Sequence, residues 1–284
     1  MNSDRFVLFR QRSAASNCLF SSIGIEVQCS TAALYTIRSQ SHVHFYYCSS
    51  IEEILLYTLL MRTIPFLNSK FLVETRGDAD DSILAEIFLL REYALIEPVL
   101  KTAKTVVLDI GAHKGFFALY VRALNETVPI LCYEPEEINY VALKRHLEIN
   151  KIQGVVTKNV AAAKEEGTLL LNVSEDSHNH SIVVAPGTTV QKKVNATTLE
   201  KIVSKFEKVD VLKMDIEGAE FQIFENINPE VLQKIGTLFM EYHQYGPSMQ
   251  AEVLQTIFKK SGFTVKKFPS KYDKRMGFLW ATRA

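Results

Sequence analysis

The stretch Val107-Leu-Asp-Ile-Gly-Ala-His-Lys-Gly115 decides the fold of this chain. It continues an apolar run over residues 105–110, which is typical of a strand covered by helices on both faces. Two glycines then stand where the strand must turn sharply into a helix, and glycine adopts the positive φ that such a turn needs. The sequence therefore predicts a buried strand, a tight loop and a helix over residues 115–124.

The alternation of strand and helix continues from this stretch to the end of the chain. Further strands are expected at 130–133, 155–160, 209–214 and 237–241, with helices at 136–150, 199–206, 219–225 and 249–261. Additional strands are expected at 167–173 and 189–195, and the runs 264–268 and 277–282 suit an antiparallel hairpin. This order implies a parallel sheet with right-handed crossovers. The predicted fold class is α/β, with a mostly parallel seven-stranded sheet and a C-terminal antiparallel hairpin. This arrangement resembles that of the Rossmann-like class I methyltransferases.

The domain boundary is expected after residue 68, with an N-terminal extension over 1–68 and the domain that resembles a methyltransferase over 69–284. Ser50-Ile-Glu-Glu53 has the spacing of a capping box, and the apolar run behind it ends near Arg62. These features predict an α-rich extension, although residues 42–48 alternate weakly and suit a strand.

Composition excludes several classes of protein. The 284 residues include 32 basic and 32 acidic ones, and a net charge of zero disfavours binding to nucleic acid or to an anionic membrane. No segment offers the roughly 20 apolar residues of a membrane span. The four cysteines form no CxxC pair, so a reducing, cytoplasmic location is expected. The sequence leaves a homo-oligomer open.

The glycine loop and the next strand end together predict a site for a nucleoside with a zwitterionic tail. Gly111 lets a ligand approach the backbone closely, and Asp109 at the strand tip suits a cationic amine. Glu134 ends the following strand, where an acidic side chain accepts hydrogen bonds from ribose hydroxyls. Pro135 adds a flat wall beside it.

Two cofactors compete for this site. A dinucleotide would want the pattern G-x-G-x-x-G, which Ala112 and Lys114 interrupt. An acid before the glycines favours S-adenosylmethionine over NAD. An NAD-dependent oxidoreductase and a non-catalytic, cofactor-binding scaffold remain as alternatives.

A second charged motif, Leu212-Lys-Met-Asp-Ile-Glu-Gly-Ala-Glu220, closes the strand at 209–214. Its loop faces the first one across the carboxyl edge of the sheet, where ligands bind in such folds. Glu241 and His243 lie at the tip of the neighbouring strand. Asp215, Glu217, Glu241 and His243 are the catalytic candidates for taking a proton from a substrate. Alternatively, Asp215 and Glu241 hold a divalent cation such as Mg²⁺.

At these two motifs the sequence resembles the FkbM-type methyltransferase family. Arg76-Gly-Asp-Ala-Asp80, Glu92-Tyr93 and Asn159-Val-Ala161 support the resemblance, which covers about residues 70–284. It implies S-adenosylmethionine as cofactor and methyl transfer to a hydroxyl of a small molecule or sugar. His113 stands where the family usually has Asn. The polar loop at 174–181 is expected to shape the acceptor pocket. The expected cofactor contacts are Asp109, Gly111, Ala112, His113, Gly115, Glu134, Pro135, Val160 and Ala161.

Overall fold

A computed structural model describes residues 17–20, 25–31, 34–39, 42–47, 61–173, 190–246, 249–271 and 273–283. The chain divides into two compact units, residues 1–61 and 62–284. The boundary expected from the sequence lies seven residues further along, after residue 68.

The described residues of the first unit form one antiparallel sheet. Its strands follow chain order and are β1 (Asn17–Phe20), β2 (Ile25–Thr31), β3 (Leu34–Ser39) and β4 (His42–Tyr47). The strand expected at 42–48 is confirmed. The α-rich extension is wrong for these residues, because each of the four strands pairs with its neighbour in the sequence and so satisfies its backbone hydrogen bonds. Most of the helix expected to end near Arg62 lies outside the described residues, and Met61–Phe66 is strand β5.

A seven-stranded sheet with the order β15-β16-β14-β13-β7-β8-β9 forms the centre of the second unit. All neighbours pair in parallel except β16, which runs antiparallel to both β14 and β15. The predicted α/β class I sheet with its C-terminal hairpin is confirmed. The strands are β7 (Val107–Ile110), β8 (Ile130–Tyr133), β9 (Val155–Lys158), β13 (Val209–Met214), β14 (Ile235–His243), β15 (Thr264–Pro269) and β16 (Met276–Thr282).

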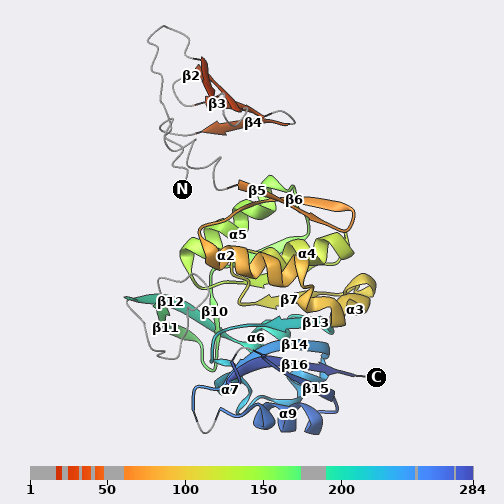
Figure 1. Cartoon of the computed structure of the whole chain (residues 1–284). Coiled ribbons are helices and arrows are strands. Elements are labelled where there is room, and N and C mark those ends of the chain that lie inside the picture. The colour runs from red at the N-terminus through yellow and green to blue at the C-terminus, as the bar shows by residue number, and fades with distance from the viewer. Residues whose placement is uncertain are drawn as a thin grey trace. The chain divides into compact units, whose positions relative to one another are not determined.

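Helices cover both faces of this sheet (Figure 1). One face packs against α3 (Glu97–Thr102), α4 (Phe116–Leu124) and α5 (Glu137–Ile149). The other packs against α6 (Leu199–Val203), α7 (Glu220–Phe224), α8 (Pro229–Gln233) and α9 (Ala251–Lys260). Strand side chains alternate between the two cores: Leu108 and Ile110 join one, and Val107 joins the other. Burial on both faces explains why the strand sequences are continuously apolar.

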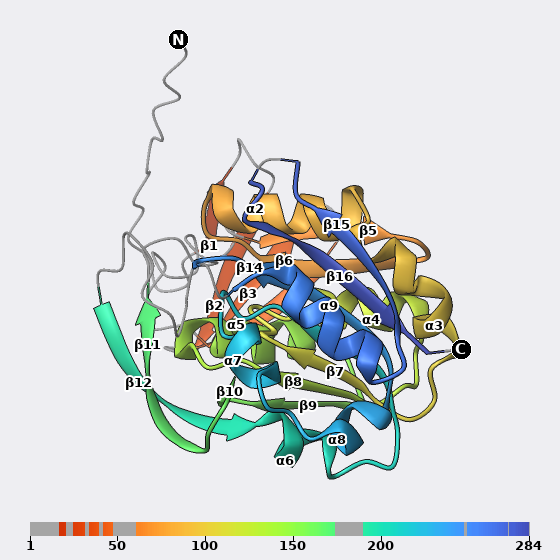
Figure 2. The ribbon, with the colours of Figure 1, turned by 90° about the horizontal axis from the view of Figure 1, so that it is seen from below.

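Two smaller sheets flank the central one. Strands β5 (Met61–Phe66) and β6 (Ser69–Glu74) form a hairpin that leads into α2 (Asp78–Leu84), the π-helix η1 (Ala85–Leu89) and the 3₁₀-helix η2 (Glu92–Ile96). In Figure 2, β10 (Ala161–Ala163), β11 (Gly167–Val173) and β12 (Val190–Thr198) extend to one side of the domain. Here β12 pairs with both other strands, in the order β10-β12-β11.

The strand order places a topological switch point between β7 and β13. From β7 the chain continues outward to β8 and β9, and then returns to β13 and β14 on the other side. Crevices at the carboxyl ends of strands at such a point are where open α/β sheets bind ligands. The two charged motifs of the sequence meet there.

Candidate active site

The β7–α4 loop is held tightly against its neighbours. The amides of Gly111 and Ala112 both donate to the carbonyl of Tyr133, at 3.0 and 2.9 Å. Gly111 has φ 76°, and a Cβ built on it would overlap the carbonyl oxygen of Asp215 in the second loop. Glycine is therefore required both by the backbone conformation and by the contact between the two loops.

Asp109 is fully buried and forms an ion pair inside the sheet. Its Oδ1 lies 3.3 Å from Nζ of Lys213, and the two residues face each other across β7 and β13. The ammonium also donates to the carbonyl of Gly111 at 2.7 Å. Burial raises the pKa of Asp109, and Lys213 opposes this effect. Asp109 thus fixes the lysine that supports the loop. Its contact with a ligand amine stays a prediction.

A second buried ion pair fixes the other side of the loop. Nζ of Lys114 lies 2.6 Å from Oδ1 of Asp80, with both side chains almost fully buried. His146 joins the same region, since its Nδ1 lies 2.7 Å from the carbonyl of Lys114 and its Nε2 accepts from the amide of Glu74. The Arg76-Gly-Asp-Ala-Asp80 motif therefore contributes a buried carboxylate to the loop.

Glu134 ends β8 and faces the loop, with only 5% of its surface exposed. Its carboxylate accepts from the amides of His113, at 2.7 Å, and Glu136, at 2.9 Å. Burial raises the pKa of Glu134 to about 7, although these two hydrogen bonds oppose the shift. This carboxyl therefore changes its charge near neutral pH, where a hydrogen-bond acceptor for ribose would be needed.

A cavity of about 640 Å³ lies over the switch point and joins both motifs. Six of the expected cofactor contacts line it: Gly111, Ala112, His113, Glu134, Pro135 and Ala161. The other three, Asp109, Gly115 and Val160, are not among its described lining residues. Gly115 instead has φ 81° and lies against Leu143 at the start of α4, while Val160 packs on the hydrophobic core.

Other residues of the cavity wall could not be recognised as such from the sequence. Tyr93, Phe116 and Phe117 line it from the helices, and Phe268 and Phe278 from the hairpin. Apolar side chains look the same in a core as in a pocket, so only Glu92-Tyr93, which supports the family resemblance, drew attention to this wall. The loop expected to shape the acceptor pocket, 174–181, lies outside the described residues.

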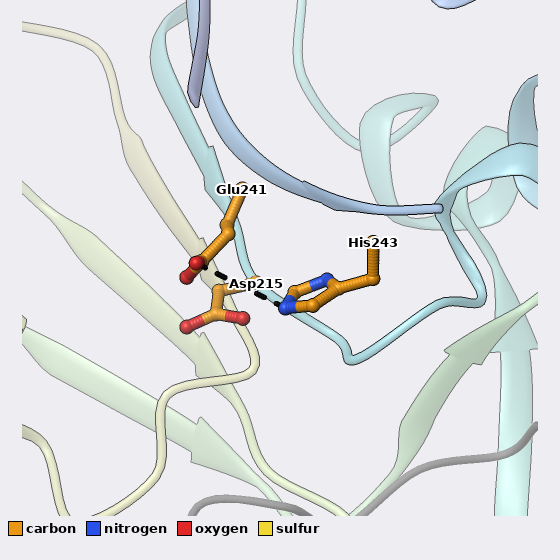
Figure 3. Close-up of side chains that lie close together, drawn as sticks. All are labelled: Asp215, Glu241 and His243. Carbon is orange, nitrogen blue, oxygen red and sulfur yellow. Dashed lines mark ion pairs between the residues drawn. The ribbon is translucent and has the colours of Figure 1, made fainter. Parts of the chain in front are cut away.

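The tips of β13 and β14 bring the catalytic candidates together. Figure 3 shows Asp215, Glu241 and His243 pointing toward one another. Nε2 of His243 lies 3.9 Å from Oε1 of Glu241 and 3.3 Å from Oε2 of Glu217. Asp215, Glu217 and Glu241 line the cavity, whereas His243 is fully buried behind them.

Glu220 completes this cluster from the start of α7. It is fully buried, and its Oε1 lies 3.0 Å from Nδ1 of His243. The sequence places Glu220 at the end of the second charged motif but gives it no partner. Nothing in the local sequence indicates the contact with His243, because it depends on how α7 packs beside β14.

Burial and the charges of neighbouring carboxylates shift the pKa values of the groups in this cluster. Burial raises the pKa of Glu217 to about 7, and burial together with Asp215 raises the pKa of Glu241 well above its usual value. For His243, burial lowers the pKa, but the carboxylates of Glu220, Glu217 and Glu241 outweigh burial and raise the pKa well above its usual value. The cluster can therefore hold and exchange protons near neutral pH.

The strand order and the cavity at the switch point define a class I methyltransferase type of fold. The family model described as the methyltransferase FkbM domain matches residues 109–265, which include both motifs. These are 157 of the 284 residues, more than half of the chain. The chain belongs to the FkbM methyltransferase family. This membership favours the methyltransferase hypothesis over the NAD-dependent oxidoreductase.

Curated relatives agree with this family. Methyltransferase sdnD of Sordaria araneosa is 22% identical over 192 residues, which are 56% of this chain and 73% of that protein. Methyltransferase 1 of Beauveria bassiana is 24% identical over 157 residues, which are 48% of this chain and 63% of that protein. The human probable methyltransferase-like protein 24 is 39% identical over 69 residues, 23% of this chain and 19% of that protein.

Solved structures of low similarity were also found. The methyltransferase FkbM from Methylobacillus flagellatus has a TM-score of 0.44 at 14% identity, covering 72% of this chain and 55% of that one. A putative methyltransferase from Streptococcus mutans, in complex with SAH, has a TM-score of 0.44 at 10% identity, covering 68% and 97%. At these values, the fold assignment depends on the strand order and the family match.

Among the described residues, none of the helices combines the length and apolarity needed to cross a bilayer.

Proposed function

We propose that this chain uses S-adenosylmethionine to methylate a hydroxyl oxygen of a small molecule or sugar. This proposal rests mainly on the cavity that joins the glycine loop and Glu134 to three carboxylates near neighbouring strand ends. These are Asp215, Glu217 and Glu241. One half of the cavity has groups that suit a nucleoside. The other half has groups that suit a proton-bearing acceptor.

The residues of the first half fit the nucleoside part of the cofactor. Glu134 lines the cavity with a buried carboxylate, which would accept hydrogen bonds from the ribose hydroxyls. Pro135, Ala161, Ala162 and Leu171 provide an apolar wall for an aromatic base. Asp109 does not line the cavity, so we expect it to act through Lys213 and the carbonyl of Gly111.

When bound, the cofactor supplies an electrophilic methyl group on a sulfonium sulfur. The chain must then orient the acceptor oxygen in line with that carbon and take up the hydroxyl proton. Asp215, Glu217 and Glu241 are the groups that face the cavity and can receive this proton. His243 touches Glu217 and Glu241 from behind, and we assign it the positioning of these two carboxylates.

The test is turnover of the full chain with S-adenosylmethionine on a panel of sugars and hydroxylated small molecules. Methyl ethers should be detected by mass spectrometry, together with release of S-adenosylhomocysteine. Glu217→Gln and Glu241→Gln should lower kcat while S-adenosylhomocysteine still binds. Glu225→Gln is the matched control, because Glu225 is exposed and pairs with Lys164 away from the cavity.

Each alternative has its own outcome in this experiment. Binding of S-adenosylhomocysteine without any methylated product would favour a non-catalytic scaffold. Binding of a nicotinamide cofactor without binding of S-adenosylhomocysteine would favour an oxidoreductase.

A further inference from the structure

Three side chains of metal-ligand type converge at the tips of β13 and β14. One donor atom from each of Asp215, Glu241 and His243 lies within 4.8 Å of the other two (Figure 3). Divalent first-row ions bind such donors at about 2.1 Å, so donors sharing an ion lie at most about 4.2 Å apart. A small rotation of the carboxylates would bring all three into one coordination shell.

Two polar atoms of these side chains are buried without a hydrogen bond in the described part of the chain. They are Nε2 of His243 and Oδ1 of Asp215, and His243 itself is fully buried. Nε2 lies 3.3 Å from a carboxylate oxygen of Glu217. Leaving buried polar atoms without a hydrogen bond costs free energy, so such atoms call for a ligand or an ion.

The other ring nitrogen of His243 is oriented by a carboxylate. Nδ1 lies 3.0 Å from Oε1 of Glu220, a fully buried residue. When an ion displaces the proton of Nε2, Nδ1–H still donates to Glu220 and the lone pair of Nε2 points toward Asp215 and Glu241. This carboxylate–histidine arrangement is the usual support of a histidine that binds a metal.

Charge in the cluster is unbalanced. Four carboxylates, those of Asp215, Glu217, Glu220 and Glu241, surround a single imidazole. The nearby ammonium of Lys213 lies against Asp109 and the carbonyl of Gly111. When deprotonated, these four groups carry more negative charge than the imidazole can offset, and a divalent cation would offset this charge in place of protons.

We propose that Asp215, Glu241 and His243 bind a divalent transition-metal ion, with Glu220 orienting the histidine. The set differs from the Mg²⁺ pair expected from the sequence because it includes an imidazole, which suits manganese, iron or zinc better than magnesium. Asp215 and Glu241 line the cavity, so open coordination positions face the acceptor half. Binding of an acceptor oxygen to the ion is the one part of this inference that rests on the proposed function.

The probe is Mn²⁺, titrated into the full chain after treatment with EDTA and dialysis. Electron paramagnetic resonance measures free Mn²⁺, and we expect saturable binding of one ion per chain. Asp215→Asn and Glu241→Gln keep side-chain size and should weaken binding at least about tenfold, and Glu220→Gln about tenfold to a hundredfold. Glu225→Gln should leave binding unchanged, and circular dichroism confirms that each variant is folded.

A second measurement needs no variant. Spin-echo spectra of the wild-type complex should show coupling of Mn²⁺ to an imidazole nitrogen. Absence of saturable binding, absence of that coupling, or displacement of Mn²⁺ by an equal concentration of Mg²⁺ would overturn the proposal. Binding of S-adenosylhomocysteine is measured in parallel, so that a failed metal site and a failed methyltransferase assignment give different results.

Discussion

Buried charge is arranged differently around the two loops that meet at the cavity. Around the β7–α4 loop, two buried carboxylates each have a lysine of their own: Asp80 pairs with Lys114, and Asp109 with Lys213. At the tips of β13 and β14, four carboxylates share His243. Buried charges are stable when they are paired and hydrogen-bonded, so these two ion pairs need no further partner. The carboxylates at the tips of β13 and β14 therefore suit a cation or a proton.

The largest effect is expected where the two halves touch. Gly111→Ala places a methyl group on the carbonyl of Asp215 and forces a strained φ, so the free energy of unfolding should fall by more than about 4 kcal/mol. Gly77→Ala is the matched control, because Gly77 also has positive φ, 83°, but nothing lies within 4 Å of its Cβ position. It should cost only about 1–3 kcal/mol. Urea unfolding measures both, and equal costs would refute the loop contact.

The next largest effect is expected at the buried ion pair of Asp80 and Lys114. Lys114→Met leaves the carboxylate of Asp80 buried without its cation, which should destabilise the fold by about 3 kcal/mol. Lys164→Met removes one partner of an exposed pair with Glu225 and should cost less than about 1 kcal/mol. The measurement is again urea unfolding. A small effect for Lys114→Met would mean that the loop is not held by this ion pair.

A smaller effect concerns ligand binding at Glu134. Its pKa is raised to about 7 by burial, and only the charged form offers all its oxygens as acceptors. The affinity for S-adenosylhomocysteine should therefore increase about tenfold as pH rises from 6 to 8. Glu134→Gln should remove this pH dependence and weaken binding at pH 8 by about 2 kcal/mol. Isothermal titration at both values of pH measures this, and an unchanged pH profile in the variant would contradict the assignment.

Much of the fold was predictable from local patterns, whereas the pairing of charges was not. The apolar run before Gly111 and the alternation that follows it predicted the central sheet, because covered strands must be apolar. The motif residues Glu134, Asp215, Glu217 and Glu241 were correctly expected at one edge. The sequence did not reveal that Asp109 faces Lys213, since this depends on β7 and β13 being neighbours.

The remaining errors have similar causes. The strands β1 to β4 were missed as a sheet because their short runs gain stability from pairing, which the local sequence does not display. The contact of Glu220 with His243 joins residues 23 positions apart and depends on packing of α7 beside β14. Packing between separate elements therefore determines which charged groups meet at the tips of β13 and β14.

The most direct test of the central claim is a crystal structure of the full chain with S-adenosylhomocysteine. The account predicts that the ribose hydroxyls bind the carboxylate of Glu134 and that the sulfur faces the half of the cavity formed by Asp215, Glu217 and Glu241. A nucleoside bound elsewhere, or a ribose without contact to Glu134, would contradict it.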